Sequence, residues 1–169
     1  MTRSPAGRAS ASEPNGDGFG AQPRGRSASE FLDFPRNRSL LDRVVHARVA
    51  RLATHNPSGA IDLVPITFAF VDEAIVTAVD HKPKRTTHLQ RLENVRRNPH
   101  VTVLVDQYAD DWNSLWWVRI RGEAEVHDVV SAEAVAALSE KYEQYRQQPP
   151  SGPAIVVRVH DLLAWNADG

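Results

Sequence analysis

Three strand-like segments joined by very short turns constrain the fold of this 169-residue chain more than any other feature. Residues 49–54, 61–71 and 75–79 are rich in β-branched side chains, and residues 56–59 and 72–73 form the turns between them. Turns of this length cannot hold a crossover helix, so consecutive strands must pair antiparallel. The sequence therefore predicts an antiparallel sheet rather than a parallel α/β fold.

Three more strands are predicted in the second half of the chain. They cover residues 101–105, residues 115–127 with a bend at Gly122, and residues 154–159. A six-stranded antiparallel sheet must close on itself or be covered, because its edges would otherwise expose unpaired main-chain groups. The expected fold class is mainly β (α+β), a six-stranded antiparallel barrel-like sheet with about three peripheral helices.

The three helices are predicted from apolar residues at helical spacing. They cover residues 39–48, a segment that starts after Thr86 or Thr87 as N-cap and ends at residues 98–99, and residues 131–147 with Ser131 as N-cap. Apart from Met1, residues 1–29 hold one large apolar side chain, Phe19, so burial cannot offset the entropy lost on ordering them. We expect a disordered tail at residues 1–29 and one domain at residues 30–169.

Composition excludes several classes of function. The net charge of −1 gives no basic field for nucleic acid, and no apolar run approaches the ~18 residues that span a bilayer. The chain has no cysteine, which suits a reducing cytoplasm. Its histidines are scattered and its acidic loop at 106–111 lacks a calcium-binding pattern. We expect a cytoplasmic protein with no metal site that contacts neither nucleic acid nor membrane.

The strongest local signal for a binding site is a basic segment directly before the second predicted helix. Lys82, Lys84 and Arg85 are followed by Thr86, so three cations and a hydroxyl group precede the free N–H groups of a helix start. Such a cluster is typical of a phosphate or carboxylate site, and the alternative is a solvated basic loop.

Trp116 and Trp117 are adjacent on a predicted strand, so their side chains must face opposite sides of the sheet. One indole can enter the core. The other must be exposed, lie in a subunit interface or stack on a flat ligand, and the sequence leaves these alternatives open.

Four segments together resemble a known family. Residues 64–68, 75–80, 82–85 and 89–101 are similar in order and spacing to the pyridoxamine-phosphate-oxidase-like split β-barrel superfamily. Within it, the chain is most similar to the F420-dependent oxidoreductases of the actinobacterial flavin/deazaflavin group. The resemblance covers about residues 31–166 and implies a six-stranded antiparallel split β-barrel that forms a homodimer with cofactor sites at the interface.

The resemblance also implies which positions hold the cofactor. The main chain of one strand would lie along the isoalloxazine-type ring, and the end of the next strand near the cofactor side chain; the matching residues are Val64, Pro65, Ile66, Thr67, Ala78 and Val79. The cofactor phosphate would be held at positions matching Lys82, Lys84, Arg85 and Thr86. Trp117 would line the ring from the partner subunit, where flavin-binding oxidase relatives have a glutamine.

The function implied is an F420-dependent oxidoreductase that transfers a hydride between the deazaflavin and an unidentified small electron-poor substrate. An FMN-binding oxidoreductase on the same fold and a non-catalytic flavin- or tetrapyrrole-binding protein are the alternatives. Because the cofactor carries the chemistry, no residue is nominated as a catalytic acid or base. The pyridoxal-phosphate signature of the true oxidases is not recognisable in the sequence, which disfavours vitamin B6 chemistry.

Overall fold

The computed structural model describes residues 35–79 and 89–167. The fold is mainly β with peripheral helices, as predicted. The helices are α2 (Pro35–His46), α3 (Gln90–Arg97), the 3-10 turn η1 (Trp112–Ser114), α4 (Ala132–Lys141) and α5 (Glu143–Gln147). The strands are β1 (Ala50–His55), β2 (Ile61–Ile66), β3 (Ala69–Val71), β4 (Ala74–Ala78), β5 (His100–Gln107), β6 (Trp116–His127) and β7 (Ala154–Asn166).

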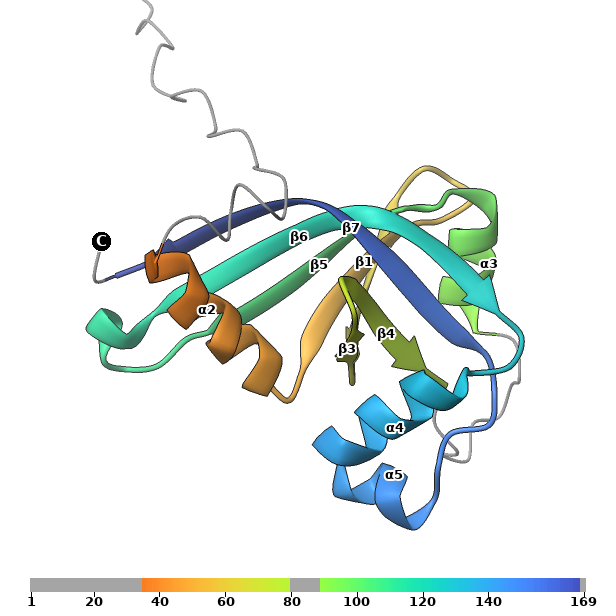
Figure 1. Cartoon of the computed structure of the whole chain (residues 1–169). Coiled ribbons are helices and arrows are strands. Elements are labelled where there is room, and N and C mark those ends of the chain that lie inside the picture. The colour runs from red at the N-terminus through yellow and green to blue at the C-terminus, as the bar shows by residue number, and fades with distance from the viewer. Residues whose placement is uncertain (1–34, 80–88, 168–169) are drawn as a thin grey trace, which may run out of the picture.

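All seven strands form one antiparallel sheet in the order β2-β1-β5-β6-β7-β4-β3. The outermost strands, β2 and β3, are consecutive in the sequence and are joined by only Thr67 and Phe68. Two residues cannot bridge a flat sheet of this width, so the sheet must curl until its two edges approach each other. Figure 1 shows the resulting curled half-barrel.

The sheet has seven strands rather than the six predicted, because residues 61–71 do not form one strand. The chain leaves the β1 ladder after Ile66 and joins β4 at Ala69. At the break, the Phe68 N–H donates to the hydroxyl of Tyr142 at 3.0 Å instead of to a neighbouring strand. A side chain from the distant α4–α5 hairpin therefore satisfies the main chain where the strand divides.

The hydrophobic core fills the concave side of the sheet. Leu40 and Val44 of α2 pack against the inward side chains of the central strands, such as Val103 and Val118. Figure 1 shows α2 crossing in front of β5 and β6. A second cluster lies between α4 and the β3–β4 edge, around Leu138. The helices thus cover the inner face and one edge, and none of those in the described ranges is long and apolar enough to span a membrane.

The predicted bend at Gly122 is confirmed as an irregularity in the β6–β7 ladder. The register shifts between Arg121 and Gly122, and a Cβ at Gly122 would lie 2.1 Å from the carbonyl oxygen of Arg158. Only glycine allows this close approach of two main chains.

Two element boundaries differ from the prediction because of tertiary contacts. The last strand runs from Ala154 to Asn166 rather than ending at residue 159, since β6 offers a pairing partner along its whole length. The last helical segment divides at Tyr142, whose extended main chain directs the ring into the core. Ser131 caps α4 as predicted, accepting a hydrogen bond from the Ala134 N–H.

Candidate functional site

The strand β2 carries the first predicted cofactor-binding residues. Val64 and Ile66 turn towards the core, whereas Pro65 is exposed on the outer side. Within the ranges that the structure describes, β2 pairs only with β1. Alternate N–H and C=O groups of an antiparallel edge strand point away from the sheet, so this edge presents main-chain donors and acceptors to a ligand.

Thr67, Ala78 and Val79 lie at the same end of the β3–β4 hairpin. Because Ala69 pairs with Val76, the residues before Ala69 and the residues after Val76 extend beyond this end together. The Thr67 hydroxyl lies 2.9 Å from the hydroxyl of Tyr145. Ala78 is buried, and the Val79 N–H donates to a carbonyl oxygen on the loop before β7. The structure therefore brings the predicted ring-binding and side-chain-binding strands to the same end of the sheet.

The predicted anion-binding residues Lys82, Lys84, Arg85 and Thr86 lie outside the described residues. The helix that follows begins at Gln90 with Leu89 in the N-cap position, so the prediction of Thr86 or Thr87 as N-cap is wrong.

A buried asparagine attaches α3 to the sheet. Asn94 is fully buried, and its side-chain amide donates to Thr54 Oγ1 at 3.0 Å and to Asp62 Oδ2 at 2.8 Å. Its carbonyl oxygen accepts from Gln90 at 3.0 Å. The two bonds donated by Asn94 hold α3 against the β1–β2 hairpin, and the bond from Gln90 lies within the helix and orients the amide.

The tryptophan pair divides as the strand geometry requires. Trp116 is 4% exposed and belongs to the core, with its indole N–H 3.4 Å from Gln107 Oε1. Trp117 faces the opposite side, half-buried, between its cross-strand neighbours Asp106 and Trp165. The prediction that one indole enters the core and the other does not is therefore confirmed.

One chain does not bring Trp117 to the other predicted ring-binding residues. The strands β1 and β5 separate β6 from β2, and three strand spacings amount to about 14 Å along the sheet. A single ring system does not span this separation along one sheet.

Trp117 belongs to the outer face of the sheet, which carries several exposed apolar side chains. Ile61, Leu63 and Trp165 are 55%, 60% and 45% exposed there. The outer face also holds the ion pair between Arg51 and Asp106. Alternation along residues 61–65 is the sequence signal that could have revealed this apolar surface.

Arg119 is a second residue of the outer face, and one of its hydrogen-bond donors has no acceptor among the described residues. Its Nε is buried and has no hydrogen-bond partner, and its cross-strand neighbours are Leu104 and Leu163. A buried guanidinium N–H without an acceptor is costly. The outer face therefore combines exposed apolar area with a guanidinium whose buried Nε no described residue satisfies.

A pocket of about 430 Å³ lies farther along the outer face, near the Gly122 irregularity. Three histidines border it, His55, His100 and His160. Among the residues described, no group of three or more His, Cys, Asp or Glu side chains is placed to hold a metal ion.

Two residues at the junction of α4 and α5 have pKa values that burial shifts, which sequence reasoning did not anticipate. Burial, with a smaller contribution from Arg48, lowers the pKa of Lys141 to about 8. Burial raises the pKa of Tyr142, opposed by its hydrogen bond to Phe68 and by the charge of Arg48. Nothing in the local sequence distinguishes these residues from other helix-terminal side chains.

Solved structures similar to this chain share its fold. The conserved hypothetical protein Rv2991 of Mycobacterium tuberculosis has a TM-score of 0.60 and 23% sequence identity, over 77% of this chain and 84% of the other. An F420 reductase has a TM-score of 0.52 and 22% identity, over 72% of this chain and 94% of the other. The heme storage protein HutZ of Vibrio cholerae has a TM-score of 0.56 and 14% identity, over 75% and 92%.

Identities this low establish the fold alone, and these neighbours differ in the ligands that their names imply. No curated protein matches the sequence. The family described as pyridoxamine 5'-phosphate oxidase, however, matches residues 38–166, which include every described strand and most of α2. Because this family matches most of the chain and the sheet is curled and antiparallel, the chain belongs to the pyridoxamine 5'-phosphate oxidase family.

Proposed function

We propose that this protein is a homodimeric F420-dependent oxidoreductase whose cofactor lies between the free edge of β2 and Trp117 of a second copy. The observation that carries the proposal is the half-buried indole of Trp117 on the outer sheet face, near Arg119, whose Nε has no acceptor among the described residues. A flat aromatic ligand with polar edges complements both features, because an indole stacks on ring systems and a guanidinium donates to carbonyl oxygens.

The described residues of β2 and β4 fit a deazaflavin in two respects. The edge of β2, at Val64, Pro65, Ile66 and Thr67, offers main-chain groups to the polar edge of the ring. The β4 end at Ala78 and Val79 lies at the same end of the sheet, so the cofactor side chain would continue past it.

The basic segment that follows would hold the anionic arm. Lys82, Lys84, Arg85 and Thr86 come directly after β4 in the sequence and supply several charge-assisted donors. F420 carries a phosphate and an acidic tail, which accounts for more cations than a single phosphate needs. The buried Asn94 network holds the helix that follows this segment in place.

F420, when bound, supplies hydride-transfer chemistry, and the protein supplies position and electrostatics. Trp117 would restrict one face of the ring, and the β2 edge would fix its register. The absence of cysteine suits a reducing cytoplasm, where we expect the protein to act.

The test is a parallel fluorescence titration of the purified protein with F420, FMN and haemin. We expect saturable binding of F420, weaker binding of FMN, and about a hundredfold weaker F420 binding in the Lys84→Ala/Arg85→Ala double variant. Arg96→Ala is the matched control, because Arg96 is an exposed cation of α3 that pairs with Glu93 and Asp128.

Other outcomes discriminate between the alternatives. A tightly held FMN with no F420 binding would assign the FMN oxidoreductase function instead. Haemin binding without either flavin would point to tetrapyrrole binding, as the name of the neighbour HutZ implies for that protein. Equal loss of F420 affinity in Arg96→Ala and in the double variant would contradict the assignment of the basic segment.

A further inference from the structure

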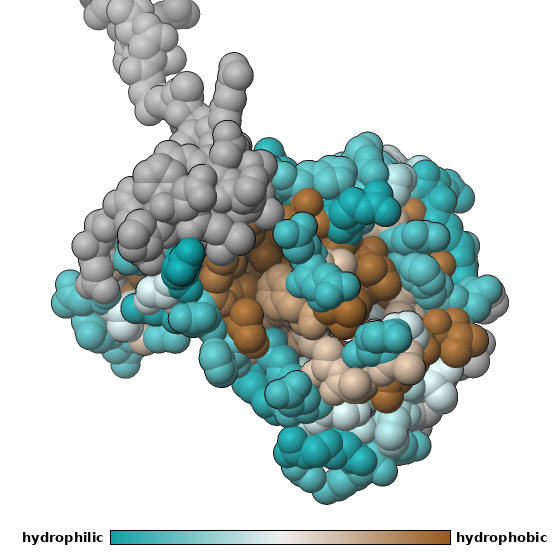
Figure 2. Space-filling view, in the orientation of Figure 1, coloured by the Kyte–Doolittle hydropathy of each residue, from teal (hydrophilic) through white to brown (hydrophobic). Residues whose placement is uncertain are grey.

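A pocket of about 420 Å³ lies away from the outer face, between the end of α2, the strand β3 and the helix α4. Val45, Phe70 and Ala137 give it apolar walls, and Val45 is 46% exposed. In Figure 2, apolar side chains gather in the middle of this side of the molecule, with polar side chains around them. The volume is in the range of pockets that enclose small organic molecules.

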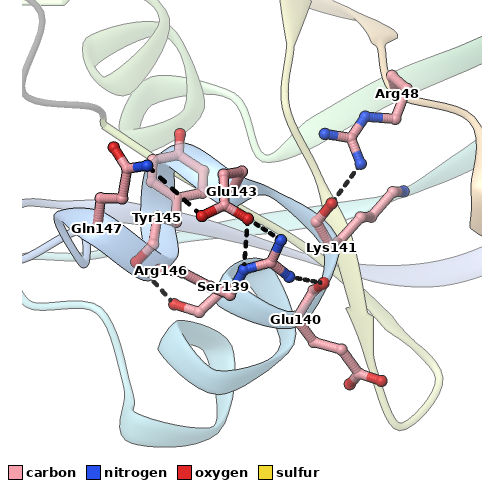
Figure 3. Close-up of polar contacts among 8 residues, drawn as sticks. All are labelled: Arg48, Ser139, Glu140, Lys141, Glu143, Tyr145, Arg146 and Gln147. Carbon is pink, nitrogen blue, oxygen red and sulfur yellow. Dashed lines mark hydrogen bonds and ion pairs between the residues drawn. The ribbon is translucent and has the colours of Figure 1, made fainter.

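Two cations border this pocket close to each other. The Nζ of Lys141 lies 3.6 Å from the centroid of the Phe68 ring and 5.7 Å from the centroid of the Tyr142 ring. The Cζ of Arg48 lies 4.6 Å from the centroid of the same Tyr142 ring. Arg48 donates a hydrogen bond to the main-chain oxygen of Lys141, which holds the Arg48 side chain next to the end of α4 (Figure 3). The ring faces attract both cations, and apart from this Arg48 bond neither side chain donates a hydrogen bond to any described residue.

No carboxylate compensates this charge. The Lys141 Nζ is buried without a hydrogen-bond partner, and the ion pairs formed among the described residues include neither Lys141 nor Arg48. Glu140 also borders the pocket, but its carboxylate points away from both cations in Figure 3. A further basic side chain, His46, borders the pocket from α2, with its Nδ1 2.7 Å from a carbonyl oxygen of its own helix.

Uncompensated positive charge beside an apolar wall is the arrangement that a small organic anion complements. We propose that this pocket binds a small carboxylate with an apolar body, held by the Arg48 guanidinium and attracted by the charge of the Lys141 ammonium. The carboxylate accepts hydrogen bonds from the exposed Arg48, and the apolar body packs against Val45, Phe70 and Ala137. This site is separate from the proposed cofactor site, and its test needs no cofactor.

A carboxylate fits better than an inorganic phosphate because the walls are largely apolar. A bare dianion would leave Val45, Phe70 and Ala137 in contact with water, whereas an aromatic acid buries them. The lowered pKa of Lys141 supports the same assignment, since it reflects burial and a neighbouring cation with no anion present.

The test is a titration of ¹⁵N-labelled protein with benzoate and with its neutral analogue benzamide, in a buffer free of carboxylate and phosphate. Amide shifts are expected at Phe70, Ala137 and Lys141, with a Kd for benzoate of about 1 mM or tighter and at least tenfold weaker binding of benzamide. Benzoate affinity should also fall as the pH rises above about 8, the pKa of Lys141, because the neutral amine no longer attracts the anion.

Variants test the role of the amine. Lys141→Met keeps the apolar stem and should weaken benzoate binding at least tenfold and abolish its pH dependence, while leaving benzamide unchanged. Arg146→Met is the matched control: Arg146 is an exposed cation of the same hairpin that pairs with Glu143 and does not border the pocket. The proposal is overturned if benzoate and benzamide bind the wild type equally, if shifts occur elsewhere, or if both variants bind benzoate like the wild type.

Discussion

The hydroxyl of Tyr142 lies 3.0 Å from the main-chain nitrogen of Phe68, and this contact ties the α4–α5 hairpin to the point where the first long strand divides. The hydroxyl also lies 3.0 Å from the carbonyl oxygens of Phe68 and Arg48, either of which can accept its hydrogen. One side chain therefore connects β3, the α2–β1 link and the hairpin around the end of the proposed cofactor edge.

Tyr142→Phe should lower the free energy of unfolding by about 1–3 kcal/mol, because the buried Phe68 N–H loses its acceptor. Tyr145→Phe is the matched control, since it removes the 2.9 Å contact with a Thr67 hydroxyl that is partly exposed and can bind water. We expect a loss below about 1 kcal/mol for the control in urea unfolding. Equal losses in the two variants would argue against the special role of Tyr142.

Lys141→Met should stabilise the ligand-free protein at pH 7. The folded-state pKa of Lys141 is about 8, below the usual value of 10.5, so the unfolded chain binds a proton more tightly. The resulting destabilisation is fully present below pH 8 and is relieved as the pH rises towards 10.5.

The wild type should therefore gain stability relative to Lys141→Met between pH 7 and about 9.5, by about 1 kcal/mol, since partial exposure screens the charge. Tyr142 is common to both proteins, so its raised pKa cancels in the comparison. A stability difference that does not vary with pH would show that folding does not lower the pKa of the Lys141 amine.

Gly122→Ala should destabilise the β6–β7 pair by more than about 2 kcal/mol. The added Cβ would meet the Arg158 carbonyl oxygen at 2.1 Å and a Val157 methyl carbon at 2.9 Å, so the ladder would have to open. Gly152→Ala is the control, because its Cβ would lie 3.7 Å from the nearest atom, the oxygen of Val79. Denaturant midpoints that shift equally in both variants would contradict the close approach at Gly122.

Leu63→Glu should convert the proposed homodimer into a monomer, measured by light scattering after gel filtration. Leu63 is 60% exposed on the outer face, and a carboxylate there would be buried unpaired if a second copy covers this face. Val129→Glu is the matched control, since Val129 is 71% exposed in the turn before α4. A wild type that is monomeric at about 100 μM, or a dimer that survives Leu63→Glu, would refute this interface.

Local sequence patterns determined most of the secondary structure and part of the site. Alternating and β-branched residues located the strands, Gly122 located the irregularity in the β6–β7 ladder, and Ser131 located the start of a helix. Each of these features depends on neighbours within a few residues. The same alternation separated Trp116 from Trp117 and so placed one indole outside the core.

Only the tertiary structure decided where β2 ends and which charges lie uncompensated. Residues 61–71 read as one strand, and the break at Thr67 and Phe68 exists because a tyrosine 74 residues later supplies the hydrogen-bond partner. The hydrogen bond from the Arg48 side chain to the main-chain oxygen of Lys141 likewise joins residues 93 positions apart. Such contacts depend on how the sheet curls and packs, and no short-range periodicity encodes them.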